Sequence, residues 1–138
     1  MRLWHQSLLP YLNRQHLLGQ HRECTALRGA GWGRKHSVVD YVFTHDPAYL
    51  VAYHRHVMDE MVNRGYHPDI IWRNSDYRGK TLGMQDGWVD LNLVDKLYDT
   101  NDIVFPEHND AYLEECISLL ESKGYEHIRE DFQNASTL

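Results

Sequence analysis

The stretch that most restricts the fold runs from residue 46 to residue 65 and reads "DPAYLVAYHRHVMDEMVNRG". Asp46 is a favourable N-cap, and Pro47 is tolerated in the first turn of a helix. Apolar side chains then recur at helical intervals along the stretch, at Leu50, Val57, Met58, Met61 and Val62. Gly65 is a typical residue for the C-terminal end of such a helix. The pattern predicts one amphipathic helix with its apolar side against a core.

Two more stretches carry the same kind of pattern. Residues 7–28 have a candidate cap and a stripe of leucines, and three glycines follow at Gly29, Gly31 and Gly33. Residues 109–124 repeat the scheme, and a short helix is possible over 90–99. One short strand is possible over 37–43, where "SVVDYVF" is rich in β-formers. We therefore predict a compact all-α single domain over residues 1–138, with about three main helices and long connecting loops.

Positive charge is concentrated at the start of an acidic chain. The net charge of the 138 residues is −6, but residues 1–38 hold six basic side chains and one carboxylate, Glu23. The six are Arg2, Arg14, Arg22, Arg28, Arg34 and Lys35. The sign of the charge on one part of the surface, rather than the net charge of the protein, decides whether that surface can bind a polyanion. A phosphate-binding surface is one explanation, and an ordinary solvated helix face is the other.

Other kinds of site have little support in the sequence. The two cysteines, Cys24 and Cys116, form no CxxC motif, so neither a disulfide framework nor a structural zinc site is indicated, and we expect a reducing, cytoplasmic setting. The ten histidines lack metal-binding spacing, so we predict no metal and no cofactor, with a site assembled across the chain left open. No apolar run approaches the ~18 residues of a membrane span, so no membrane partner is expected.

Glu23 is the residue that the charge pattern does not explain. On a helix, His16, Gln20 and Glu23 lie along one side, and Gly19 leaves space beside them. A carboxylate repels the phosphates that its basic neighbours would bind. Glu23 is therefore either a catalytic acid–base or a salt-bridge partner of Arg22 or Arg28, and the charge pattern alone favours the salt bridge.

The same segment resembles the first helix of the pyrimidine-dimer DNA glycosylases, the phage endonuclease V-like family. The resemblance covers QHL at residues 15–17 and RE at residues 22–23, within "RQHLLGQHRE". It resumes with RKH at residues 34–36 and fades through the helix that ends in "NRGY". It therefore includes about the first 65 residues, less than half of the chain.

The resemblance implies a DNA glycosylase with abasic-site lyase activity, whose partner is double-stranded DNA carrying a damaged base or an abasic site. The nucleophile would be the N-terminal α-amine of Met1, retained because Arg2 is too large for methionine removal. Glu23 would be the acid–base, and Arg22 would contact DNA near the lesion. The other DNA-binding candidates are Arg2, Arg28, Arg34, Lys35 and His16.

An α-amine suits this role because its reference pKa is near 7.7–8.0, so about a quarter or more is neutral at pH 7.5. The chain is acidic after residue 38 and ends in "DFQNASTL". These features favour the alternative, a non-enzymatic helical nucleic-acid-binding or interaction module on the same scaffold. The sequence indicates neither the lesion nor the oligomeric state.

Overall fold

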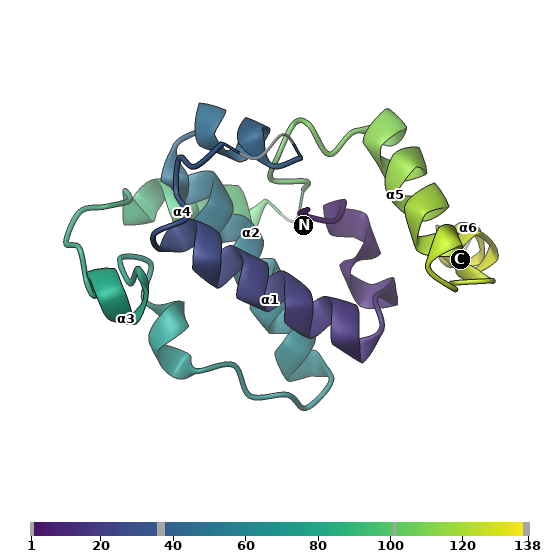
Figure 1. The fold of residues 1–138 in the computed structure, drawn as a ribbon, viewed down its shortest axis with the longest axis horizontal. Coiled ribbons are helices and arrows are strands. Elements are labelled where there is room, and N and C mark those ends of the chain that lie inside the picture. Colours follow the sequence, from purple (N-terminus) through teal and green to yellow (C-terminus); the bar gives the residue numbers. More distant parts are fainter. Residues whose placement is uncertain (1, 36–37, 101, 137–138) are drawn as a thin grey trace.

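The computed structural model describes residues 2–35, 38–100 and 102–136 (Figure 1). The α-helices are α1 (Arg14–Arg28), α2 (Pro47–Asn63), α3 (Gly79–Leu82), α4 (Leu91–Asp99), α5 (Asp110–Ser122) and α6 (Ile128–Ser136). The 3₁₀ helices are η1 (Gln6–Tyr11), η2 (Asp40–Thr44) and η3 (Ile70–Arg73). These three ranges contain no β-strand, only an isolated bridge between Tyr77 and Met84. The predicted all-α class is confirmed.

The helix predicted from residue 46 forms as α2. The Asp46 carboxylate accepts a hydrogen bond from the Ala48 amide at 2.9 Å, which satisfies one orphan donor of the first turn. At the other end Gly65 takes a φ of 83°, a conformation that other residues rarely adopt. Val62 departs from the prediction, because its side chain is 53% exposed. α1, α2 and α5 are the three main helices expected.

The single helix predicted from residue 7 to residue 28 is wrong in its first part. The chain forms η1, becomes extended at Leu12 with ψ 140°, and then starts α1. Pro10 lies inside η1, and the chain leaves the helical conformation two residues later, at Leu12. Asn13 is the actual N-cap, and its side chain accepts from the His16 amide at 2.8 Å.

The possible strand near residue 40 is also wrong, within the part of it that the structure describes. Residues 40–44 form η2 instead. Val39 and Val42 are both buried, and their spacing of three places them on one side of a 3₁₀ turn. Residues 36 and 37 lie outside the described residues. The helices α3 and α6 were not predicted.

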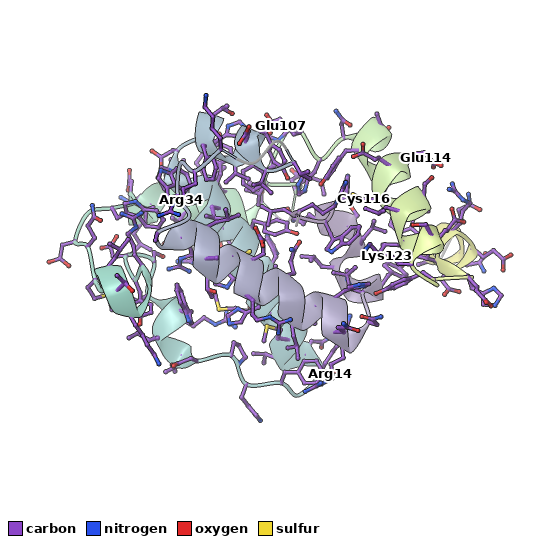
Figure 2. All side chains as sticks on the ribbon, viewed as in Figure 1. Arg14, Arg34, Glu107, Glu114, Cys116 and Lys123 are labelled. Atoms are coloured by element: carbon purple, nitrogen blue, oxygen red, sulfur yellow. The ribbon has the colours of Figure 1, made fainter. Side chains whose placement is uncertain are left out.

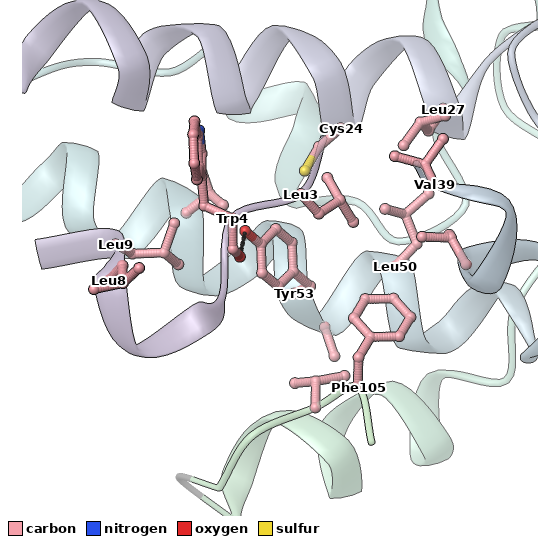
Figure 3. Close-up of a cluster of buried hydrophobic side chains, with 14 of the residues drawn as sticks. Leu3, Trp4, Leu8, Leu9, Cys24, Leu27, Val39, Leu50, Tyr53 and Phe105 are labelled. Atoms are coloured by element: carbon pink, nitrogen blue, oxygen red, sulfur yellow. Dashed lines mark hydrogen bonds between the residues drawn. The ribbon is translucent and has the colours of Figure 1, made fainter. Parts of the chain in front are cut away.

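The core is built around α2, which contacts α1, α4, η1 and η2. The N-terminal segment, residues 2–5, passes through this core, with Leu3 fully buried. Figure 3 shows Leu3 and Trp4 beside Cys24 of α1 and Tyr53 of α2. α5 and α6 lie at the opposite end of the molecule from α3 (Figure 1). Among the described helices, none has both the length and the apolar character needed to cross a membrane.

Candidate functional site

A pocket of about 370 Å³ opens beside the N-terminal half of α1, and we call it the α1 pocket. It is bounded by α1, the N-terminal segment and the C-terminal part of α5. Its lining consists of Arg2, Trp4, Gln15, His16, Gly19, Gln20, Arg22, Glu23, Val38, Leu119 and Lys123. The structure thus brings together four of the predicted site residues, namely Arg2, His16, Arg22 and Glu23.

Glu23 lies half-buried in this pocket, on the side of α1 that the helical period predicts. His16, Gly19 and Gln20 lie on the same side, because residues three and four apart are neighbours on a helix. A Cβ on Gly19 would lie 3.6 Å from Nη2 of Arg22, which is ordinary van der Waals contact, so the Arg22 guanidinium occupies the space that the sequence predicted to be open beside this glycine. Gly19, Arg22 and Glu23 all line the α1 pocket.

The N-terminal segment is fixed to the wall of this pocket by Gln20, whose side chain is buried. Gln20 Oε1 accepts from the Trp4 amide at 2.6 Å and from the Tyr53 hydroxyl at 2.7 Å. Gln20 Nε2 donates to the Arg2 carbonyl at 2.9 Å. From the other side, the Tyr112 hydroxyl of α5 donates to the Leu3 carbonyl at 2.6 Å. Three consecutive residues are thus held on both sides at the pocket.

Gln20 lies on the side of α1 that the helical period predicts, but the period does not indicate its hydrogen bonds. Tyr112 and Lys123 were not predicted as site residues. A buried glutamine among leucines on a predicted helix was the one available signal, because a buried amide must find partners. The Leu3 carbonyl that accepts from the Tyr112 hydroxyl is 109 positions away in the chain, so no local pattern indicates this contact.

Arg2 and His16 are both engaged inside the protein. Arg2 Nη1 lies 3.1 Å from the Glu115 carboxylate, and its guanidinium lies over the Trp4 ring at 5.8 Å. His16 Nδ1 lies 2.7 Å from the Tyr125 hydroxyl, and the two rings are stacked. Partial burial lowers the pKa of His16, and the charge of Lys123 adds to the effect. His16 is therefore mostly neutral at pH 7 and can offer a hydrogen bond rather than a charge.

Arg22 and Lys123 supply the exposed positive charge of the pocket. Lys123 caps the C-terminal end of α5 (Figure 2). Neither side chain forms an ion pair with another described residue. Both cations are therefore available to a phosphate of a bound ligand.

Arg28 lies in the interior, which is inconsistent with its predicted contact to DNA. Its side chain is fully buried, and it donates to His54 Nδ1 at 3.0 Å and to the carbonyls of Trp72, Asn74 and Tyr77 at 2.8–3.1 Å. Burial lowers its pKa to about 10, so the group stays charged at neutral pH. Arg28 follows Leu17 and Cys24 on the inward side of α1, a register that the leucine stripe could have indicated.

Arg34 and Lys35 lie beyond the C-terminal end of α1, where both are exposed (Figure 2). Neither lines the α1 pocket. Met1 and His36 lie outside the described residues. Cys24 is a packed thiol, as its place on the apolar stripe predicted, and burial raises its pKa. Within residues 2–35, 38–100 and 102–136, no three His, Cys, Asp or Glu side chains are grouped as metal ligands.

Comparison of the sequence with known proteins identifies a family for this chain. A family model described as pyrimidine dimer DNA glycosylase matches residues 1–74, which include η1, α1, η2, α2 and η3. The matched region supplies the whole lining of the α1 pocket except Leu119 and Lys123. No curated protein and no solved structure gave a match. Because the family match spans more than half of the sequence, this chain belongs to the pyrimidine dimer DNA glycosylase family.

Proposed function

We propose that the protein is a DNA glycosylase with abasic-site lyase activity on damaged double-stranded DNA. The observation that carries the proposal is the α1 pocket, in which Arg2, His16, Arg22 and Glu23 meet within the region matched by the family. The pocket is open, and the family membership suggests a pyrimidine dimer as its lesion. In this proposal the pocket receives the deoxyribose of the damaged nucleotide.

The nucleophile in this proposal is the α-amine of Met1. The carbonyl of Arg2 is bonded to Gln20, which precedes Glu23 by one helical turn. Arg2, the next residue along the chain after Met1, lines the α1 pocket. An amine at the end of a chain needs no burial to be partly neutral at physiological pH.

The chemistry breaks three bonds of the sugar in turn: the glycosidic bond, the C1′–O4′ bond of the ring and the bond to the 3′-phosphate. The amine attacks C1′ of the sugar, and the glycosidic bond breaks as the base leaves with its electron pair and takes up a proton. Loss of the amine proton and opening of the sugar ring give an imine between the chain and C1′. Removal of a proton from C2′ then expels the 3′-phosphate, which cleaves the strand. Glu23 is the group proposed to carry these protons and to stabilise the cationic sugar.

The distribution of ion pairs supports a phosphate-binding surface on an otherwise acidic protein. Four arginines away from the α1 pocket are paired with carboxylates, in Arg55–Asp95, Arg64–Glu60, Arg73–Asp59 and Arg129–Glu114. Arg22, Arg34, Lys35 and Lys123 form no such pair with the described residues. Within the pocket Arg2 is paired with Glu115, whereas these four cations on or near α1 remain available to DNA.

Borohydride trapping on a duplex with one abasic site tests the proposal directly. Borohydride reduces an imine to a stable amine, so wild-type protein should form a covalent adduct that maps to the Met1 amine. Protein with an acetylated N-terminus should form none. Glu23→Gln should bind the duplex but trap at a rate lower by about 10²-fold or more. Glu126→Gln changes an exposed carboxylate outside the α1 pocket and should trap at the wild-type rate.

Two outcomes would overturn the proposal. An adduct that maps to a lysine instead of Met1 would refute the N-terminal mechanism. Tight binding to the duplex without any adduct would favour the alternative, a non-enzymatic nucleic-acid-binding module on the same scaffold.

A further inference from the structure

A second hollow, of about 330 Å³, lies beside the C-terminal end of α1, and the proposed reaction does not use it. We call it the α3 hollow. It is lined by Thr25, Ala26, Gly29, Ala30, Gly31, Trp72, Arg78, Gly79, Lys80 and Thr81. The last four of these lie beyond the family match, which ends at residue 74. They belong to α3 and the residue before it, which Figure 1 shows beside the C-terminal part of α1.

The α3 hollow adjoins the α1 pocket along one side of α1. Arg22 lines the α1 pocket, whereas Thr25 and Ala26 line the α3 hollow. Residues three and four apart on a helix have Cβ atoms about 5–6 Å apart. A ligand that extends along α1 from Glu23 toward Ala26 therefore approaches the wall formed by α3.

The wall formed by α3 is fixed in place by reciprocal hydrogen bonds with α1. Arg78 Nε donates to the Arg28 carbonyl at 2.8 Å, and its guanidinium lies 4.4 Å from the centre of the Trp88 ring. Arg28 in turn donates to the carbonyls of Trp72, Asn74 and Tyr77. Gly29 permits the close approach, because a Cβ there would lie 3.0 Å from the Arg78 carbonyl oxygen. The wall is thus preorganised before any ligand binds.

Lys80 is the exposed cation of this wall. Its ammonium forms no ion pair with a described residue, and the Thr81 next to it is also exposed. The acidic neighbours in the loop are Asp76 and Asp86, and neither lines the hollow. Asp76 accepts hydrogen bonds from the amides of Gly87 and Val89 instead.

We propose that Lys80 binds a backbone phosphate of the same DNA duplex, on the side of the lesion that lies toward the C-terminal end of α1. This inference rests on the proposed function. From Glu23 to Gly29, which borders the α3 hollow, the helix rises about 9 Å, more than two steps of about 3.4 Å along a DNA strand. We therefore place the phosphate outside the two nucleotides next to the lesion. The contact would lie outside the part of the chain that the family shares.

Two lysine variants test this contact under matched conditions. Lys80→Gln removes the proposed contact, and Lys96→Gln removes another exposed lysine, on α4 and outside the linings of both hollows. Binding is measured by fluorescence anisotropy on a duplex with one central abasic-site analogue, at a series of salt concentrations. Lys80→Gln should weaken binding and reduce the slope of log K against log salt by about 0.9, the value for one phosphate. Lys96→Gln should leave both unchanged.

Truncated duplexes locate the contact. Two duplexes are cut to two nucleotides beyond the abasic site, one on each side of the lesion. The difference in binding affinity between wild type and Lys80→Gln should vanish on one of these two duplexes and persist on the other.

The inference fails if Lys80→Gln and Lys96→Gln have equal salt slopes on the full duplex while wild-type protein binds and forms the imine adduct. The proposed function survives that result. A reduced slope for Lys80→Gln without any adduct in wild type would support the contact and overturn the enzymatic proposal.

Discussion

Replacing Gln20 by leucine tests how much the fixed N-terminal segment contributes to stability. The two side chains have similar size, so the change removes hydrogen bonds and leaves little cavity. The Trp4 amide and the Arg2 carbonyl lose their partner, while the Tyr53 hydroxyl can turn its one proton to the Trp4 carbonyl, 2.7 Å away. The variant therefore leaves the buried Trp4 N–H donor and the partly exposed Arg2 carbonyl acceptor without a protein partner.

The expected loss follows from those two groups. A buried polar group left without a hydrogen bond costs about 1–3 kcal/mol, and the value is at the low end where water can reach it. Trp4 is buried, whereas Arg2 is half-buried at the pocket. We expect Gln20→Leu to lower the free energy of unfolding by about 2–4 kcal/mol. Folded domains are stable by about 5–15 kcal/mol, so this loss is easily measured.

Urea unfolding followed by tryptophan fluorescence and circular dichroism measures the change. Gln15→Leu is the control, because Gln15 is on the same helix and is exposed. The reasoning is refuted if the two variants unfold within about 0.5 kcal/mol of each other with the same m-value. A double-mutant cycle with Tyr53→Phe should give a coupling energy of about 0.5–3 kcal/mol, because Gln20 and Tyr53 share a hydrogen bond.

Three further predictions concern buried groups. Burial lowers the pKa of His108 to about 3, so below its ordinary pKa near 6.5 the unfolded chain binds a proton that the folded protein does not. The free energy of unfolding should therefore fall as the pH falls, by up to about 1.4 kcal/mol per unit, and urea titrations of His108→Gln should show a shallower fall. Arg28→Lys should lower the free energy of unfolding by about 2–4 kcal/mol in urea titrations, because lysine cannot reach the same set of carbonyls, whereas Arg14→Lys at an exposed site should change it little. Burial raises the pKa of Cys24 and of Cys116, so native protein should not react with a thiol reagent until it is denatured, and rapid labelling of either thiol would contradict the buried placement.

Local patterns were sufficient for the long helices and for one side of the site. The start of α2 was predicted from Asp46 and Pro47, and its end was predicted from Gly65. These predictions worked because helix caps and stops act through the backbone of neighbouring residues. The period of 3.6 residues likewise predicted that His16, Gln20 and Glu23 share a side of α1. These predictions were correct since each depends only on residues within two turns of one another.

Local patterns failed where tertiary contacts outweighed them. Residues 38–43 are rich in β-formers, yet Val39 and Val42 are buried by a 3₁₀ turn instead. Arg28 has the charge of a DNA ligand, but it is held in the core by four hydrogen bonds that it donates to residues lying between 26 and 49 positions further along the chain. Burial depends on the whole fold, so the charge of a residue alone does not tell whether it is exposed.

The sequence by itself determined the all-α class, the register of α1 and the family to which the chain belongs, because helical periodicity and short motifs are properties of adjacent residues. Only the tertiary structure decided which cations are available to a phosphate and what encloses the site. Tyr112 and Lys123 reach the N-terminal segment and the α1 pocket from α5, and Lys80 reaches the α3 hollow from a segment outside the family match. Contacts between residues far apart in the chain form when the core packs, and nothing in their local sequence encodes them.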